Sequence, residues 1–192
     1  MKKICISERF GLFEATLRQK KTQLRLIVPS KFYEDKRLGD MLAKGKGKPP
    51  LPMHEIEVAP FKVGEMVALA QTYKELLETE YLSKEVEDEV CRLVEKGHLG
   101  CTNRMCVKAE LMPHLIEFTD VRVENLQDIT EEDCIKEGIV RLENSFIAMD
   151  GKKGVCANEA QLVFEDVFNA VSRRKLWDSN PKVFVYDFVL VI

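Results

Sequence analysis

The stretch LIEFTDVRVENLQDITEEDCIKEG, residues 115–138, decides the fold, because it contains a strand signal followed directly by a helix signal. Residues 116–126 alternate in polarity and are rich in Val, Ile, Phe and Thr, which favours an extended chain. The alternation predicts that one face of this strand holds Ile116, Phe118, Asp120, Arg122 and Glu124. The other face would hold Glu117, Thr119, Val121 and Val123.

A short capped helix is expected after this strand. Asp128-Ile129-Thr130 ends the extended run, and the Thr130 hydroxyl can accept a free backbone N–H of the next turn. Three acids at residues 131–133 favour the positive end of a helix dipole, and Gly138 supplies the stop. The sequence therefore predicts a strand that leads into a helix of fewer than ten residues.

Length and composition are those of one globular domain. The chain has 192 residues, of which 45% are hydrophobic and 32% charged. No targeting segment follows the basic start, and the longest apolar run, 183–192, is interrupted by Asp187, so we expect a cytoplasmic protein without a membrane span. Six cysteines without a CxxC pair predict reduced thiols. His98, Cys101, Cys106 and His114 lack the paired spacing of zinc sites, so neither a metal nor a cofactor is expected.

The net charge of −3 is unevenly distributed along the chain. Residues 1–49 hold 13 Lys and Arg against 5 Asp and Glu, whereas residues 50–150 hold 10 against 22. A basic first quarter on an acidic protein indicates one positive face, which would suit a phosphate backbone. A solvated lysine-rich loop around residues 44–48 explains the same asymmetry equally well.

The remaining elements follow from periodicity and from breakers. Helices are expected over residues 11–19, 83–96 and from Asn158 onward, and a surface excursion over 29–60 with a short helix near 36–43. Strands are expected over residues 4–6, 23–28, 66–73, 105–111, 139–142, 145–149 and 183–192. The last of these is apolar on both faces, which predicts a place inside a covered sheet. Non-local strands with a few helices indicate an α+β barrel.

Four segments, in order, resemble the ASCH-domain family of the PUA-like superfamily. They are Phe10-Gly11-Leu12 with Lys21-Thr22-x-x-Arg25, FKVGEMVALAQTY at 61–73, FTDVRVENLQDITEEDCIKEGI at 118–139, and Trp177-x-x-Asn180-Pro181 followed by VFVYDF. The likeness is to uncharacterised bacterial and phage members and spans roughly half the chain. It implies a single ASCH-like domain over 1–192: a small PUA-like β-barrel of about six strands with three or four helices packed around it. Insertions would lie at about 29–60 and, in helical form, at about 75–100.

The resemblance also implies candidate catalytic residues. Family branches with acetylcytidine amidohydrolase activity use a lysine, a threonine and a glutamate. The lysine would be Lys21 and the glutamate Glu117, but Leu24 stands at the threonine position and Gln19 replaces a motif glycine. Thr22 would project from the opposite face of the strand. Two members of the trio are thus present, and a structural ion pair between Lys21 and Glu117 is the alternative.

A binding function requires fewer residues. Cations at Lys20, Lys21 and Arg25 could contact phosphates, and Tyr73 and Trp177 could stack on bases. Thr22, Gln71 and Asn180 could hydrogen-bond base edges or sugar hydroxyls. A lone tryptophan beside Asn180-Pro181 could equally close a barrel end.

Three classes of function stay open. The first is a binding protein for RNA or a modified nucleoside that uses a basic cleft between the first helix and the barrel. The second is a hydrolase acting on a nucleic-acid-derived substrate, either acetylcytidine amidohydrolase-like or a ribonuclease. The third is a protein-interaction or small-molecule module, since a fold does not dictate a function.

Overall fold

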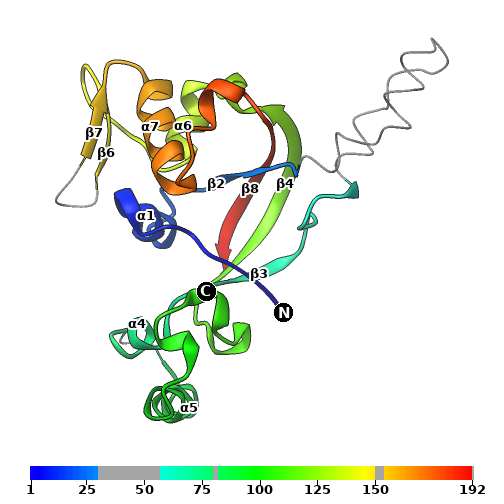
Figure 1. Cartoon of the computed structure of the whole chain (residues 1–192), viewed down its shortest axis with the longest axis vertical. Coiled ribbons are helices and arrows are strands. Elements are labelled where there is room, and N and C mark those ends of the chain that lie inside the picture. The colour runs from blue at the N-terminus through cyan, green and yellow to red at the C-terminus, as the bar shows by residue number, and fades with distance from the viewer. Residues whose placement is uncertain (30–56, 80–81, 150–153, 192) are drawn as a thin grey trace.

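The chain folds into a mixed α+β structure, as the sequence predicts (Figure 1). The computed structural model describes residues 1–29, 57–79, 82–149 and 154–191. The helices are α1 (Leu12–Leu17), α4 (Tyr73–Leu77), α5 (Lys84–Glu95), α6 (Glu131–Lys136) and α7 (Ala160–Ser172). The strands are β1 (Lys2–Ile4), β2 (Gln23–Ile27), β3 (Met66–Leu69), β4 (Leu115–Asn125), β5 (Val140–Arg141), β6 (Phe146–Met149), β7 (Gly154–Ala157) and β8 (Lys182–Val191). Short 3₁₀ helices lie at Arg9–Gly11, Leu99–Cys101, Arg104–Cys106, Ala109–Leu111, Leu126–Asp128 and Trp177–Ser179.

The main sheet has five strands in the order β1-β3-β4-β8-β2, and β5-β6-β7 form a second sheet of three strands. The predicted central position of the last strand is confirmed, because β8 pairs with β2 on one side and with β4 on the other. Strands β1 and β2 are the two edges of the main sheet within the described residues. The predicted closed barrel is therefore not confirmed by the strand pairing.

A β-bulge in β4 changes the predicted distribution of its side chains. Phe118 pairs with Phe188 and Asp120 pairs with Asp187, so Thr119 is an extra residue between two consecutive positions of β8. Ile116 and Phe118 consequently share the face of Val121 and Val123, not that of Arg122 and Glu124 as the simple alternation predicts. The bulge keeps the apolar residues of both halves of the strand on one side of the sheet.

That apolar side holds the main core. The rings of Phe61, Phe118 and Tyr186 pack together, with centroids 4.9 Å apart between Phe61 and Phe118 and 4.8 Å apart between Phe118 and Tyr186. Burial raises the pKa of the Tyr186 hydroxyl to about 12. The opposite face of β2, β8 and β4 displays polar and charged residues, and Asp133 of α6 bonds to Gln23, Arg25 and Arg122 there.

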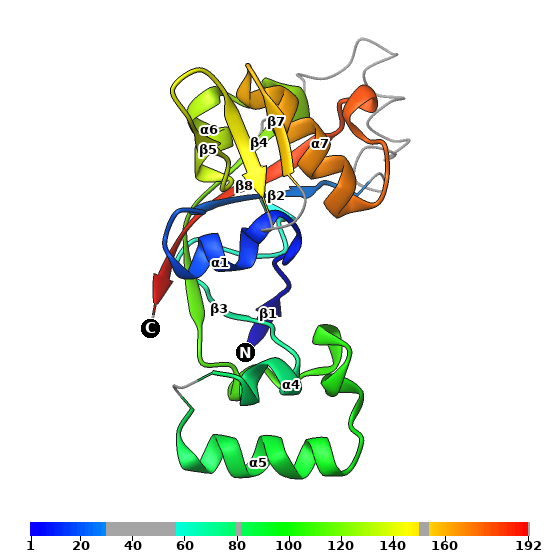
Figure 2. The ribbon, with the colours of Figure 1, turned by 90° about the vertical axis from the view of Figure 1, so that its left-hand side faces the viewer.

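A second hydrophobic cluster lies at the other end of the molecule. It is built from α4, α5 and the 3₁₀ segments, around the buried Tyr73, Leu76 and Val90. Figure 2 shows α4 and α5 at one end of the molecule, beyond β1 and β3, and α6, α7 and the small sheet at the opposite end. The predicted helix over 83–96 is confirmed, with Ser83 accepting the N–H of Val86.

Several predicted elements differ from the observed ones, and the strand expected over 4–6 is β1 at Lys2–Ile4. The strand expected over 66–73 ends at Leu69, because Thr72 and Glu75 form a capping box that starts α4. The strand expected over 105–111 is two 3₁₀ turns, the first begun by the Asn103 side chain accepting the N–H of Met105. The residue preceding α7 is Glu159 rather than Asn158, without a side-chain cap.

The helix expected after residue 130 is confirmed as α6. Thr130 Oγ1 accepts the N–H of Asp133, and Gly138 follows the helix with a φ of +102°. The insertion predicted at about 29–60 falls mostly on residues 30–56, which lie outside the described residues, as does the short helix expected near 36–43. None of the described helices combines the length and hydrophobicity needed to cross a bilayer.

Candidate functional site

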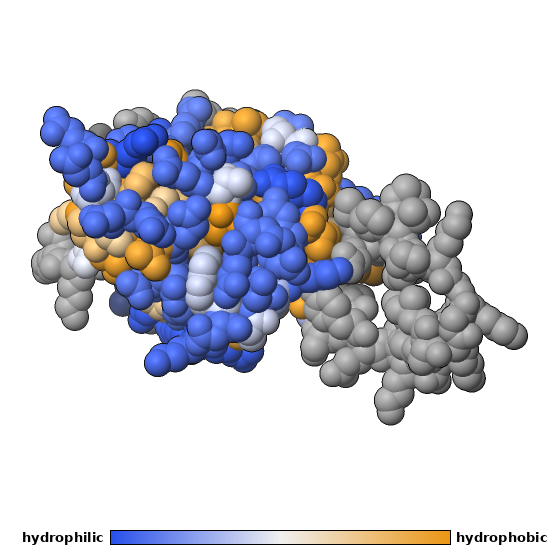
Figure 3. Space-filling model, turned by 90° about the horizontal axis from the view of Figure 1, so that it is seen from above, coloured by the Kyte–Doolittle hydropathy of each residue, from blue (hydrophilic) through white to orange (hydrophobic). Residues whose placement is uncertain are grey.

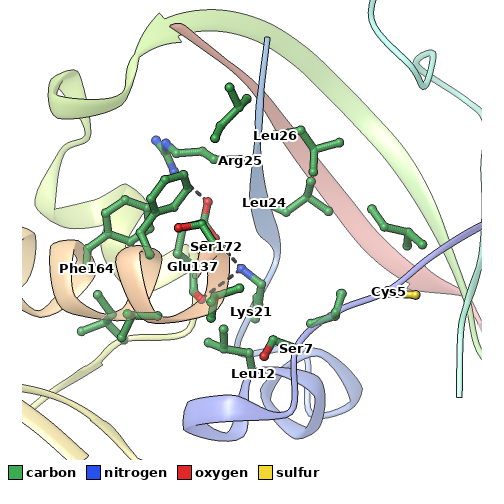
Figure 4. A pocket seen from close by; sticks show the side chains of 17 residues that line it. Cys5, Ser7, Leu12, Lys21, Leu24, Arg25, Leu26, Glu137, Phe164 and Ser172 are labelled. Atoms are coloured by element: carbon green, nitrogen blue, oxygen red, sulfur yellow. Dashed lines mark hydrogen bonds and ion pairs between the residues drawn. The ribbon is translucent and has the colours of Figure 1, made fainter. Parts of the chain in front are cut away.

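A cavity of about 300 Å³ lies between β2, α7 and the segment that follows β1 (Figure 4). Both edges of the main sheet contribute to it, since Ile4 belongs to β1 and Leu24 and Leu26 belong to β2. Its walls are mostly apolar, and α7 supplies Phe164 and Val167. Ligand sites are typically concave and apolar with a few convergent polar groups, and this volume is at the small end of their range.

The polar end of the cavity is formed by Lys21, Arg25 and Glu137. Lys21 Nζ donates to the backbone oxygens of Gln23, at 2.6 Å, and Glu137, at 3.1 Å, and to Glu137 Oε2. The other carboxylate oxygen of Glu137 accepts from Arg25 Nη1 at 3.0 Å. All three residues are at least 90% buried, so their charges are compensated inside the protein and not by water.

Arg25 connects this end of the cavity to α6. Its Nη2 donates to Asp133 Oδ2 at 3.2 Å and to Glu124 Oε2 at 3.4 Å. Its Nη1 also donates to the side-chain oxygen of Gln23 at 2.5 Å. The guanidinium lies 5.7 Å from the Phe164 ring centroid, so one face of it borders the apolar wall.

Further polar side chains extend the network across the sheet. Gln23 Nε2 donates to Asp133 at 2.9 Å and to Asp187 at 2.8 Å. Arg122 donates to Asp187 at 3.0 Å and to both oxygens of Asp133 at 3.2 Å. It also pairs with Glu124, and these carboxylates raise the pKa of Arg122 although partial burial lowers it.

The network is not a positive surface. Three cations, Lys21, Arg25 and Arg122, face the carboxylates of Glu124, Asp133, Glu137 and Asp187. An additional phosphate would have to compete with these carboxylates for cations that are already paired. The predicted basic cleft therefore lacks free positive charge at Lys21 and Arg25.

One residue that lines the cavity has a donor atom without a partner. Arg25 Nε and Gln71 Oε1 are the two buried side-chain polar atoms without a hydrogen-bond partner among the described residues. Only Arg25 belongs to the cavity lining. A buried donor without an acceptor costs about 1–3 kcal/mol, so a ligand oxygen that accepted this N–H would remove that cost.

Close packing at Gly138 brings α6 to Lys21. A Cβ at this glycine would lie 3.2 Å from Leu12 Cδ2 and 3.5 Å from Lys21 Cβ. The Thr22 N–H donates to the Lys136 oxygen at 2.8 Å, which fixes β2 against the end of the helix. The strand alternation then places Gln23 and Arg25 on the face that α6 covers.

The structure brings together two of the predicted site residues, Lys21 and Arg25, and separates them from the others. Lys20 is exposed, and Thr22 is half-buried with its backbone bonded to Lys136 and Phe188. The carboxylate that pairs with Lys21 is Glu137 and not Glu117. The expected pairing is wrong because Glu117 lies opposite Met66 of β3 and Val189 of β8, beyond the part of β8 that pairs with β2.

The predicted stacking and hydrogen-bonding residues also lie outside the cavity lining. Tyr73 is fully buried in the second cluster, where its hydroxyl accepts the N–H of Lys108 at 2.9 Å, and the buried Gln71 is in the same region. Trp177 packs on Phe164, with ring centroids 6.2 Å apart. Asn180 accepts the N–H of Gln127, which is a contact between two turns.

Sequence reasoning missed Glu137, Asp133 and Phe164. A signal for Glu137 exists in the sequence, because a glutamate at the carboxyl end of a helix is unfavourable unless a cation compensates it. Asp187, which interrupts an otherwise apolar strand, is a similar signal for a buried polar partner. For Phe164 the apolar stripe of α7 predicts only burial.

No group of His, Cys, Asp and Glu side chains suited to a metal ion occurs within the described ranges. Burial raises the pKa of the nearby Cys134 thiol to about 12, so this cysteine stays protonated and unreactive. Comparison with protein-family models, with curated proteins and with solved structures finds no match to the chain.

Acid is expected to weaken the network through Asp133. Burial raises the pKa of this carboxyl, but the hydrogen bond from Gln23 and the charges of Arg25 and Arg122 outweigh burial and hold it below the ordinary 3.8. The folded state therefore binds this proton less readily than the unfolded state, and the stabilisation is complete above pH 3.8. It should be lost as the pH falls below that value.

Urea unfolding at a series of pH values from about 5 to about 2 measures this effect. As the pH falls, the urea midpoint of the wild type should decrease more steeply than that of Asp133→Asn. The midpoint of Gln23→Leu should decrease with an intermediate slope. Equal slopes for the wild type and Asp133→Asn would show that Asp133 is not held ionised by the network.

Proposed function

We propose that the chain binds a modified nucleoside or a similar flat, uncharged molecule in the cavity between β2 and α7. The observation that supports this most strongly is an apolar cavity whose polar end is formed by Lys21, Arg25 and Glu137, and Arg25 has a buried donor, Nε, without a partner. A nucleobase has a flat apolar body that suits the surfaces of Phe164 and Leu24, and ring oxygens that can accept a hydrogen bond.

The proposal includes the PUA-like barrel. The two sheet edges, β1 and β2, both line the cavity, which is the arrangement of a curved sheet that is open where its ligand enters. A cytoplasmic location belongs to the same proposal, and the six free cysteines agree with a reducing compartment.

Hydrolysis is the second candidate function, because Lys21 and Glu137 both border the cavity. Lys21 Nζ already donates to three oxygens, and both oxygens of Glu137 already accept. A general acid or base must have its reactive position available to the substrate. Because the hydrogen-bonding positions of Lys21 and Glu137 are occupied, the site favours binding over catalysis. Incubation with N4-acetylcytidine distinguishes the two functions, since only a hydrolase releases acetate.

Obstructing the cavity tests the binding proposal. Val171 lines the cavity and is 37% exposed, so Val171→Trp adds bulk at the rim with little effect on the core. We expect at least a tenfold loss of nucleoside affinity, measured by calorimetry with the four common ribonucleosides and N4-acetylcytidine. Leu162→Trp is the matched control, because Leu162 is 49% exposed on the same helix and does not line the cavity.

Two results would contradict the proposal. One is that none of the five nucleosides binds to the wild type at millimolar concentration. The other is that Leu162→Trp weakens binding as much as Val171→Trp does. Acetate release by the wild type that is lost in Lys21→Met and Glu137→Gln, while both variants still unfold cooperatively in urea, would establish the hydrolase instead.

A further inference from the structure

Four exposed cations without an ion pair gather at the carboxyl end of α7. Arg173, Arg174 and Lys175 follow this helix directly, and Arg9 Nη1 donates to the Ala170 oxygen at 2.7 Å. None of the ion pairs formed between described residues includes any of the four. Other described cations divide between those with a carboxylate partner, such as Lys2 and Arg104, and those without one, such as Lys74 and Lys84. What distinguishes the four is that they lie at one helix end, beside the cavity.

This group, which we call the α7 basic cluster, borders the cavity. Val171 and Ser172 line the cavity, and the next residue is Arg173. Ser7 lines it as well, and Ser7 Oγ accepts the N–H of Arg9 at 3.1 Å. The Ser172 hydroxyl donates to the Arg174 oxygen at 3.1 Å, so the turn that contains the cluster is fixed to the cavity wall. Figure 3 shows hydrophilic residues over most of the end of the molecule that contains α7.

The helix dipole explains only part of this arrangement. Cations are stabilised at the carboxyl end of a helix, which accounts for Arg173 and its neighbours in sequence. It does not require a fourth cation from a segment 161 residues away, yet Arg9 is bonded to the same helix end. Placing four like charges together is unfavourable unless an anion compensates them.

We infer that the α7 basic cluster binds a phosphate attached to the nucleoside in the cavity, so that the ligand is a nucleotide, free or within single-stranded RNA. This inference rests on the proposed function. The paired charges of Lys21 and Arg25 would contact the uncharged base, and the unpaired charges at the rim would contact phosphate. One ligand would thereby use the apolar cavity and the adjacent positive surface together.

The test compares a nucleoside that binds the wild type, its 5′-monophosphate and a short single-stranded RNA containing it. We expect the monophosphate to bind at least about tenfold more tightly than the nucleoside at low salt. The variant Arg173→Ala/Arg174→Ala/Lys175→Ala should lose this gain and leave nucleoside affinity unchanged. With RNA, the same variant should show a weaker dependence of affinity on salt.

A control with the same change in charge is available in the second cluster. Lys74, Lys84 and Lys96 are exposed on or beside α4 and α5, and their triple alanine variant should retain the phosphate gain. The inference is overturned if the α7 variant binds the monophosphate and the RNA as the wild type does, or if the control variant loses as much.

The inference and the proposed function can fail separately. If no nucleoside binds to the wild type, but RNA binds and the α7 variant weakens RNA binding, the proposed nucleoside site in the cavity is wrong. The phosphate site at the α7 basic cluster is then supported. If nucleosides bind and Val171→Trp abolishes this, while phosphate adds nothing, the cavity ligand is right and the phosphate site is wrong.

Discussion

Glu137→Gln is expected to lower the free energy of unfolding by about 3–5 kcal/mol, because it leaves two buried cations without their shared carboxylate. Glu137 accepts from both Lys21 and Arg25, and the side chains of these three residues are at most 8% exposed. The amide of glutamine keeps the volume of the side chain but directs an N–H₂ group at one of the two cations. Urea denaturation at neutral pH measures the loss, and for a chain of this size the melting temperature should fall by roughly 10 °C.

A surface pair provides the control for this experiment. Glu131 also belongs to α6 and pairs with Arg141 at 3.1 Å, but its side chain is 38% exposed and that of Arg141 65%. Glu131→Gln should therefore cost less than about 1 kcal/mol. Equal losses in the two variants would show that the Glu137 pair is as well solvated as a surface pair.

A double variant separates the cost of unpaired charge from the value of the pair itself. Lys21→Met/Glu137→Leu removes the ammonium and the carboxylate together, and Arg25 keeps Asp133 and Glu124 as partners. Replacing a buried pair by apolar residues is often nearly neutral, so the double variant should be more stable than Glu137→Gln. Stability below that of Glu137→Gln would mean that Lys21 stabilises the fold through its two backbone contacts.

Phe118→Ala is the second change with a large expected effect, again about 3–5 kcal/mol of unfolding free energy. Phe118 has no exposed surface, and its ring lies between those of Phe61 and Tyr186. The substitution would leave a cavity at the centre of the apolar face of the sheet. Denaturation monitored by tyrosine and tryptophan fluorescence, together with circular dichroism, measures the change.

Deleting the adjacent Thr119 is an informative comparison. Since Thr119 is the extra residue of the bulge, its removal leaves Phe118 and Asp120 as consecutive residues that still point to opposite faces. We expect this deletion to be tolerated better than Phe118→Ala. If β4 instead alternated without a bulge, deleting Thr119 would move Asp120, Arg122 and Glu124 to the opposite face and the chain would fail to fold.

The local elements were predictable where the sequence contains a strong local signal. Thr130, the three acids after it and Gly138 define α6 without help from the rest of the chain, and the apolar β8 is predictably central. The predicted ends of strands and helices were wrong where a local polar contact outweighed the alternation of polar and apolar residues. The Thr72–Glu75 capping box begins α4 inside a stretch that otherwise has the pattern of a strand.

The candidate site was predictable only in part. Lys21 and Arg25 could be identified as site residues from the sequence, but their partners could not, because Glu137 and Asp133 are separated from them by more than 100 residues. The bulge at Thr119 has no clear sequence signal either, since an extra residue in one strand is defined only by its pairing with another strand.

The sequence by itself determined the α+β class, the short capped α6 and the inner position of β8, because propensity, capping and polarity act between near neighbours. Only the tertiary structure decided that Glu137 neutralises Lys21, that Tyr73 and Trp177 lie outside the cavity lining, and that Arg9 donates to Ala170 of α7. These facts depend on contacts between distant segments. Such contacts are set by how β2, α6 and α7 pack, and no local pattern specifies that packing.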